Sequence, residues 1–175
     1  MKLIVDKDNI EFSFSLENDV TGDDIGSEVI AEGFKRQDER HITILGGLTS
    51  ELLLNILSTL TLEERESILD QIKNLIEGLE WKFHPIEIYL ISKTGCIDNP
   101  NISENRQSYI MRVDMPDMEV LYKKINTLLK SNLPVQMPHI TLFTKGEREN
   151  PVWYGIPVPS EEEFQKLNPQ KIIFE

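Results

Sequence analysis

Two short segments of the sequence, 41–45 (HITIL) and 139–143 (HITLF), are nearly identical. Both are rich in β-branched and apolar residues, which predicts a strand in each case. Because successive side chains of a strand point to opposite faces, each segment presents a histidine and a threonine on one face and apolar residues on the other. The chain is therefore expected to fold around two strands, 98 residues apart, that each bury one face and leave an imidazole and a hydroxyl on the other.

The rest of the chain mixes strand and helix patterns without regular alternation. Strands are expected at residues 9–16, 41–45, 81–92, 108–115, 139–143 and 172–174, and helices at 52–60, 68–79, 117–131 and from Ser160 onward. A doubly wound parallel sheet requires strict alternation of strand and helix, which this order lacks. The pattern therefore predicts an α+β fold with largely antiparallel sheets.

Local signals support several of these elements. Thr61 and Glu64 have the spacing of a capping box between the first two helices. The segments 81–92 and 108–115 are separated by a polar loop around residues 98–101, which predicts a hairpin, and residues 18–24 have the composition of a turn. Since no low-complexity segment or long Gly-, Ser- or Pro-rich linker interrupts the chain, residues 1–175 are expected to form a single domain.

The charge balance restricts the class of partner. The chain has 18 Lys and Arg against 30 Asp and Glu, a net charge of −12. Binding of long DNA or RNA depends on neutralising many phosphates with basic side chains, so this composition argues against it. A small substrate, or one that is bound locally, remains compatible with it.

The cysteine content and the N-terminus indicate a compartment. The single cysteine, Cys96, cannot form an intramolecular disulfide, which is typical of a reducing environment, and no activating partner is evident beside it. The N-terminal segment MKLIVDKDNI has too few consecutive apolar residues for the core of a signal peptide, and no apolar stretch elsewhere reaches the length of a membrane span. A cytoplasmic protein without membrane association is therefore expected.

The two similar segments have a specific chemical use if their strands lie side by side. His41 and His139 can then act as general base and general acid, because imidazole titrates near neutral pH. Thr43 and Thr141 can donate hydrogen bonds to the non-bridging oxygens of a phosphate. The alternative is that these are ordinary strand residues, but two such motifs among three histidines are expected by chance at roughly 0.1%. Acid–base chemistry of this kind calls for neither a metal nor a cofactor.

The paired motifs resemble those of the two-histidine (2H) phosphoesterase superfamily. Its members, among them bacterial RNA 2′,3′-cyclic phosphodiesterases once called 2′-5′ RNA ligases, carry two well-separated copies of His-apolar-Thr/Ser-apolar. The second motif here follows Pro138 and matches the family closely, whereas the first follows Arg40, where many members have Pro or a small residue.

The resemblance implies a fold, an activity and a site. The fold would be bilobal and pseudo-symmetric, with one motif in each lobe, antiparallel sheets lining a central cleft and helices outside. The activity would be metal-independent hydrolysis or transesterification of a phosphodiester, such as a cyclic phosphate or a 2′-linked nucleotide. The catalytic residues would be His41 and His139, and Thr43 and Thr141 would bind the substrate phosphate.

Residues near the motifs are candidates for a substrate rim. Arg40, together with Lys35 and Arg36, precedes the first motif, and Lys145, with Arg148, follows the second; they would attract phosphate if they flank the cleft. Tyr154, beside Trp153, could stack on a base. The alternatives are solvated loop charges and core packing. His84 has no threonine two residues later and is expected at a strand.

Two other functions stay open at this stage. The cleft could serve a binding module that holds a nucleotide or an RNA end without turning it over, or His41 and His139 could ligate a metal, although no third ligand is evident. The motifs address only the phosphate, so the substrate could be a cyclic nucleotide, a 2′,5′-linked oligoadenylate, a cyclic phosphate of ADP-ribose or an RNA terminus. The sequence does not assign the base and the acid, nor the oligomeric state.

Overall fold

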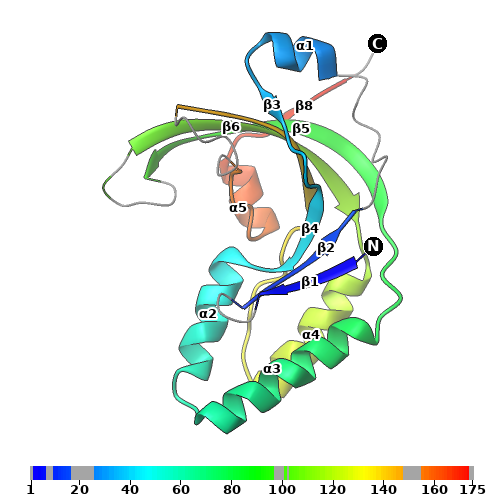
Figure 1. Ribbon diagram of the computed structural model, residues 1–175, viewed down its shortest axis with the longest axis vertical. Coiled ribbons are helices and arrows are strands. Elements are labelled where there is room, and N and C mark those ends of the chain that lie inside the picture. The colour runs from blue at the N-terminus through cyan, green and yellow to red at the C-terminus, as the bar shows by residue number, and fades with distance from the viewer. Residues whose placement is uncertain are drawn as a thin grey trace.

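The computed structural model describes residues 2–6, 10–16, 26–96, 101, 103–147 and 155–173, and its elements are labelled in Figure 1. The strands are β1 (Lys2–Asp6), β2 (Glu11–Ser15), β3 (Lys35–Arg36), β4 (His41–Leu45), β5 (His84–Cys96), β6 (Ser103–Asp114), β7 (His139–Gly146) and β8 (Gln170–Lys171). The helices are α1 (Gly26–Ala31), α2 (Gly47–Leu57), α3 (Leu62–Glu77), α4 (Asp117–Leu129) and α5 (Glu161–Lys166). All strand pairs in the described part of the chain are antiparallel, so the predicted α+β class with antiparallel pairing is confirmed.

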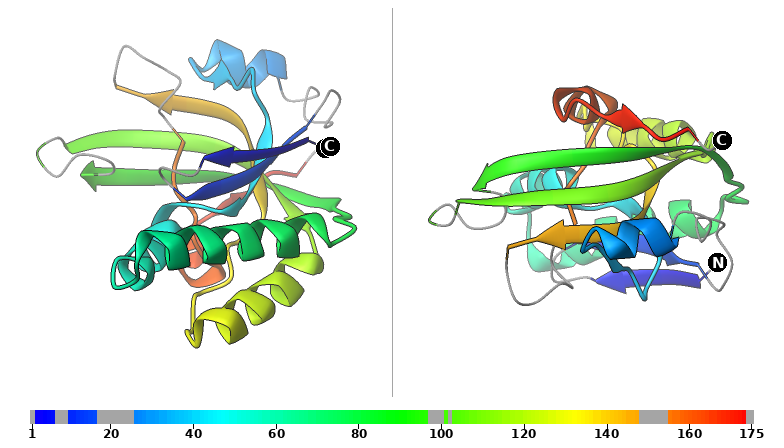
Figure 2. Two further views of the ribbon diagram at one scale, coloured as in Figure 1. Left: turned by 60° about the horizontal axis from the view of Figure 1, so that its bottom comes forward. Right: turned by 90° about the horizontal axis from the view of Figure 1, so that it is seen from above.

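The strands form one curved sheet in the order β1-β2-β4-β7-β6-β5-β8, and β3 pairs with β7 outside this path. The β5–β6 hairpin pairs along its whole length, from His84 opposite Asp114 to Cys96 opposite Ser103. By contrast, β4 and β7 are joined at one residue pair, Ile42 opposite Ile140. The sheet therefore has two halves, with β1 and β2 on one side of this junction and β5 and β6 on the other, as the right-hand view of Figure 2 shows.

The helices cover the sheet from two sides. Helices α2, α3 and α4 lie together beside the half formed by β1, β2 and β4, and α5 lies beneath the curved β5–β6 pair (Figure 1). The main core joins α2–α4 to the sheet through fully buried side chains such as Ile44, Leu53, Ile72 and Leu121. A second, smaller core forms around Phe164 of α5. Burying an aliphatic side chain of this size contributes about 1.5–3 kcal/mol, so these two cores fix the sheet from both faces.

Local sequence signals are confirmed where they were strongest. The Thr61 side chain accepts from the backbone N–H of Glu64 at 3.3 Å, and the Glu64 carboxylate accepts from the backbone N–H of Thr61 at 2.9 Å, which completes the capping box of α3. The hairpin of β5 and β6 is also confirmed. Within the described residues, no helix is long and apolar enough to cross a membrane.

Several boundaries differ from the expectation. Strand β1 was not expected, because the N-terminal apolar residues were considered only as a possible signal peptide. It pairs with β2 along the edge of the sheet. The last strand lies at Gln170–Lys171 rather than at 172–174, because residues 170 and 171 pair with β5 while Ile173 is exposed. Helix α2 begins at Gly47, five residues before the periodic apolar run. The turn expected at 18–24 lies outside the described residues.

Candidate active site

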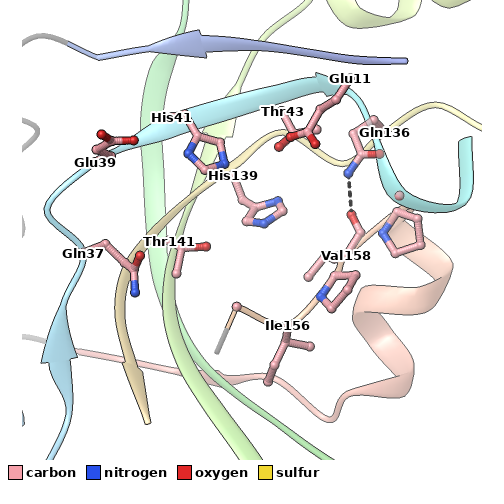
Figure 3. Close-up of a pocket in the computed structure, with 15 residues that line it drawn as sticks. Glu11, Gln37, Glu39, His41, Thr43, Gln136, His139, Thr141, Ile156 and Val158 are labelled. Carbon is pink, nitrogen blue, oxygen red and sulfur yellow. Dashed lines mark hydrogen bonds between the residues drawn. The ribbon is translucent and has the colours of Figure 1, made fainter. Parts of the chain in front are cut away.

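The two similar segments become adjacent strands of the sheet. Because β4 and β7 are antiparallel and Ile42 pairs with Ile140, equivalent residues of the two motifs meet at the junction. In this register His41 falls opposite Thr141, and Thr43 falls opposite His139. The two motifs are therefore related by a local two-fold at the Ile42–Ile140 pair, and each histidine lies beside the threonine of the other strand (Figure 3).

The alternation along each strand fixes which side chains reach the surface. Ile42 and Ile44 of β4, and Ile140 and Leu142 of β7, are fully buried in the core. The histidines and threonines between them are exposed or half-buried on the opposite face. A one-residue slip of either strand would move the apolar set to solvent, so burial of the isoleucines holds the polar set in place.

The four polar side chains of the motifs line one cavity of about 270 Å³. They form its floor, and the segment 155–159 forms the facing wall (Figure 3). Glu11 and Glu39, and the amides of Gln37 and Gln136, complete the polar lining. The structure thus brings together His41, Thr43, His139 and Thr141, which the sequence singled out.

His139 has a defined hydrogen bond that sets its tautomer. Its Nδ1 lies 2.9 Å from the backbone carbonyl of Met137, and because a carbonyl can only accept, Nδ1 donates. Burial of the ring lowers the pKa of His139 below its usual value, the Met137 hydrogen bond opposes this shift, and the charge of His41 adds to it. The ring is therefore held neutral near neutral pH, with Nε2 as the hydrogen-bond acceptor.

His41 has a different environment. It is exposed at the start of β4, where its backbone is paired with Ser15 of β2. The two imidazoles therefore share one cavity but differ in burial, and the local two-fold of the backbone does not extend to their surroundings. Groups with unlike environments are suited to opposite roles in proton transfer.

Buried groups behind β4 hold the first motif. Tyr122 of α4 is fully buried, and its hydroxyl donates to the carbonyl of Ile44 at 3.1 Å. Burial raises the pKa of Tyr122, so the hydroxyl stays protonated as a donor. Gly46 follows the strand so closely that a Cβ placed on it would lie 2.7 Å from Cγ2 of Thr43. The position of the Thr43 side chain thus depends on the absence of a side chain at Gly46.

The facing wall is attached by two side chains that the sequence analysis did not identify. Gln136 donates from Nε2 to the carbonyl of Val158 at 3.0 Å. Arg106, buried in an ion pair with Glu104 at 2.7 Å, donates to the carbonyl of Gly155 at 3.1 Å. These contacts join residues that are 22 and 49 positions apart in the sequence, so no local sequence pattern predicts them.

The expected cationic rim is not found at Lys145. The pairing of β7 with β6 skips Leu142, because Tyr109 lies opposite Phe143 and Ile110 lies opposite Thr141. This bulge reverses the alternation, so Phe143 and Lys145 face away from the side on which Thr141 lies. The Lys145 ammonium instead donates to the carbonyl of Glu32 at 2.8 Å and lies 5.3 Å from the centre of the Phe34 ring.

The other rim candidates also lie elsewhere or outside the described residues. Arg40 is half-buried, its carbonyl accepts from Leu16, and it does not line the cavity. Lys35 and Arg36 form β3, at the side of β7. Tyr154 lies outside the described residues, as do Trp153 and Arg148. The described part of the cavity lining contains two carboxylates and no lysine or arginine.

The remaining candidates are peripheral. His84 is exposed at the start of β5, as expected for a strand residue, and Cys96 is exposed at its other end. In the ranges that the structure describes, no group of three His, Cys, Asp or Glu side chains is arranged to hold a metal ion.

The cavity therefore combines a neutral imidazole with an acceptor nitrogen, a second and more exposed imidazole, and two hydroxyl groups. Such a set can take one proton, give another and hydrogen-bond a tetrahedral anion between them. Sequence alone located these four residues, because they lie in two local motifs. It missed Glu11, which approaches from β2, and three residues in the segments that precede the two motifs, Gln37, Glu39 and Gln136. Comparison of the chain with protein-family models, curated proteins and solved structures finds no significant match.

Proposed function

We propose that this protein is a metal-independent phosphodiesterase that acts on a cyclic phosphate or a 2′-linked phosphodiester of a nucleotide or RNA end. The observation that carries the proposal is the antiparallel pairing of Ile42 with Ile140, which puts both His-x-Thr faces on one cavity. This is the arrangement that the resemblance to 2H phosphoesterases implies. The two sheet halves, one on each side of that pair, would be the two lobes of such a fold.

The proton transfers follow from the two imidazole environments. His139, neutral with Nε2 free to accept, takes a proton from a water molecule as the water oxygen attacks phosphorus. The bond from phosphorus to one ester oxygen breaks, and His41, as imidazolium, donates a proton to that leaving oxygen. The product is a phosphomonoester and an alcohol, and exchange of one proton with solvent restores both histidines.

The threonines can stabilise the negative charge that develops on the phosphate. As water adds, negative charge increases on the two non-bridging oxygens. Thr43 and Thr141 lie on the same floor as the histidines and can each donate a hydrogen bond to one of these oxygens. The local two-fold matches the two equivalent non-bridging oxygens of a phosphodiester, which supports a phosphodiester rather than a planar carbonyl as the reacting group.

The test is turnover of a panel of substrates in excess EDTA. The panel contains nucleoside 2′,3′-cyclic phosphates, 2′,5′-linked oligoadenylates and oligonucleotides that end in a cyclic phosphate. Replacement of His41 or His139 by Ala should reduce kcat/KM by about 10²- to 10⁴-fold, since each removes one proton-transfer group. His84→Ala is the matched control, because His84 is exposed and lies outside the cavity, and it should keep full activity.

Two outcomes would contradict the proposal. Full activity in both single variants would show that the histidines are not the acid and the base. Tight binding of a cyclic nucleotide by calorimetry, with no product over hours, would instead identify a non-catalytic module that binds a nucleotide or an RNA end in the same cavity.

A further inference from the structure

The cavity contains acceptor groups that the phosphate chemistry does not use. Gln136 lines the cavity with only 4% of its surface exposed. Its Nε2 is engaged with the carbonyl of Val158, but its Oε1 is buried without a hydrogen-bond partner. A buried acceptor is costly when it is left unpaired, so a donor brought by a bound molecule would stabilise the complex.

Two carboxylates add negative charge at the two ends of the motif floor. Figure 3 shows Glu11 beside Thr43 and Glu39 beside His41. Glu11 approaches from β2, and its Cγ would lie 3.6 Å from a Cβ at Gly46, which places it against the turn after the first motif. Carboxylates accept hydrogen bonds, as does the amide oxygen of Gln136. Because they are charged, they also repel further anionic groups.

The facing wall of the cavity, residues 155–159, is apolar, in contrast to the polar floor. Ile156 and Val158 are buried, and Pro157 and Pro159 are more exposed beside them. This wall lies across from the histidines and offers an apolar surface for the organic part of a ligand (Figure 3). The phosphate would therefore lie on the floor, and the rest of the molecule would lie between an apolar wall and a set of acceptors.

Resting on the phosphodiesterase activity proposed above, we infer that the site selects a phosphodiester with one negative charge whose organic part presents hydrogen-bond donors, and that it discriminates against substrates with a second phosphate. A nucleoside 2′,3′-cyclic phosphate with a free 5′-hydroxyl meets both conditions, because it has a single anionic group and hydroxyl and amino donors. The same molecule with a 5′-phosphate brings a second anionic group into a cavity whose described lining contains two carboxylates, Glu11 and Glu39, and no lysine or arginine. The two acidic side chains thus act on specificity and take no part in the reaction.

The experiment compares three substrates that differ only at the 5′ position: a free hydroxyl, a phosphate, and an uncharged acetyl ester that controls for added bulk. The wild-type protein should prefer the hydroxyl to the phosphate by at least about tenfold in kcat/KM, with the acetyl ester close to the hydroxyl. Glu11→Gln and Glu39→Gln together should reduce this preference at least about threefold, and added salt should reduce it as well. Glu119→Gln, an exposed site on α4 away from the cavity, is the control and should leave the preference unchanged.

Gln136 has its own test. Gln136→Leu should raise KM for the 5′-hydroxyl substrate while kcat changes little, because the amide oxygen binds the organic part rather than the reacting phosphate. Gln136→Glu retains an acceptor and adds charge, so it should strengthen the discrimination against the 5′-phosphate. Both variants also remove the Nε2 donor to the carbonyl of Val158, so they are compared with each other, and their melting temperatures report any general loss of stability.

The outcomes separate the two proposals. Equal or better turnover of the 5′-phosphate by the wild-type protein would overturn the charge selection and leave the phosphodiesterase intact. An equal loss of kcat/KM with the 5′-phosphate and with the acetyl ester would assign the discrimination to size. That result would overturn the charge selection as well. Absence of turnover for all three substrates in the wild-type protein would overturn the inference, while turnover of 2′,5′-linked oligoadenylates or of oligonucleotides that end in a cyclic phosphate would still uphold the proposed function.

Discussion

At the scale of single residues, the candidate site depends on an inequality between two histidines in nearly identical sequences. Each occupies the same place in its motif, yet His139 is bonded to a backbone carbonyl and desolvated, whereas His41 is exposed. The motif itself could be recognised from the sequence because it is local. The environment could not, because the carbonyl of Met137 and the wall beyond it approach only after folding.

The protonation of His139 is the first quantity to measure. Burial lowers the pKa of His139, and the charge of His41 lowers it further, so the NMR titration of His139 should have a midpoint below about 6.5. If the neutral ring is the base, as proposed, the acid limb of the pH–rate profile should follow that midpoint. His41→Asn removes a positive neighbour and should raise the pKa of His139, while His84→Asn should leave it unchanged. A midpoint at or above the ordinary value would contradict the assignment of His139 as base.

At the scale of the elements, strand β4 and the turn into α2 determine where Thr43 lies. The β-branched and apolar composition of residues 41–45 predicted the strand. The sequence did not show that Gly46 must lack a side chain in order to leave room for Thr43, because that contact depends on the path of the turn.

Gly46→Ala should lower activity with little change in fold. The new Cβ would lie 2.7 Å from Cγ2 of Thr43, so the threonine must rotate and its hydroxyl leaves the phosphate position. We expect a loss of about tenfold to a hundredfold in kcat/KM. Gly155→Ala is the matched control, since Gly155 also lines the cavity but has open space where its Cβ would be. If both variants lose activity equally, crowding of Thr43 is not the cause.

The bulge at Leu142 is a second feature of element scale that sequence could not supply. Simple alternation along 139–145 would place Lys145 on the face of His139, and its position just after the second motif made it a candidate for a basic rim. The extra residue between the paired positions of Thr141 and Phe143 moves Lys145 to the other face. Bulges depend on the pairing partner, which here is β6, whose residues paired at the bulge lie 31–34 positions earlier in the chain.

At the scale of the whole molecule, the two halves of the sheet meet at Ile42 and Ile140. The main core, to which α2–α4 contribute, extends over both halves, and the smaller core around α5 includes Ile156 and Val158 of the cavity wall. The class of fold followed from the order of elements, because antiparallel sheets do not need regular crossovers. The order of strands did not follow, because a five-residue strand can pair with several neighbours.

Truncation at this junction should destabilise the protein as a whole. Ile42 is fully buried, so Ile42→Ala should lower the free energy of unfolding by about 2–5 kcal/mol, and Ile42→Val by about 0.5–1.5 kcal/mol. Urea denaturation followed by circular dichroism measures both values. Leu62→Ala, on an exposed position of α3, should change stability by less than about 0.5 kcal/mol. An Ile42→Ala protein as stable as the wild type would mean that the junction carries little of the packing energy.

The two-fold relation between the motifs has a consequence for regiochemistry. A cyclic phosphodiester has two ring ester oxygens, and a floor with perfect two-fold symmetry would let either of them depart, giving two isomeric monoesters. Here the backbone keeps the symmetry and the surroundings break it, because His139 is half-buried and bonded to the carbonyl of Met137, whereas His41 is exposed. If the proposed activity is correct, the neighbours of the histidines would therefore determine which isomer is formed, and the motif alone leaves it undetermined.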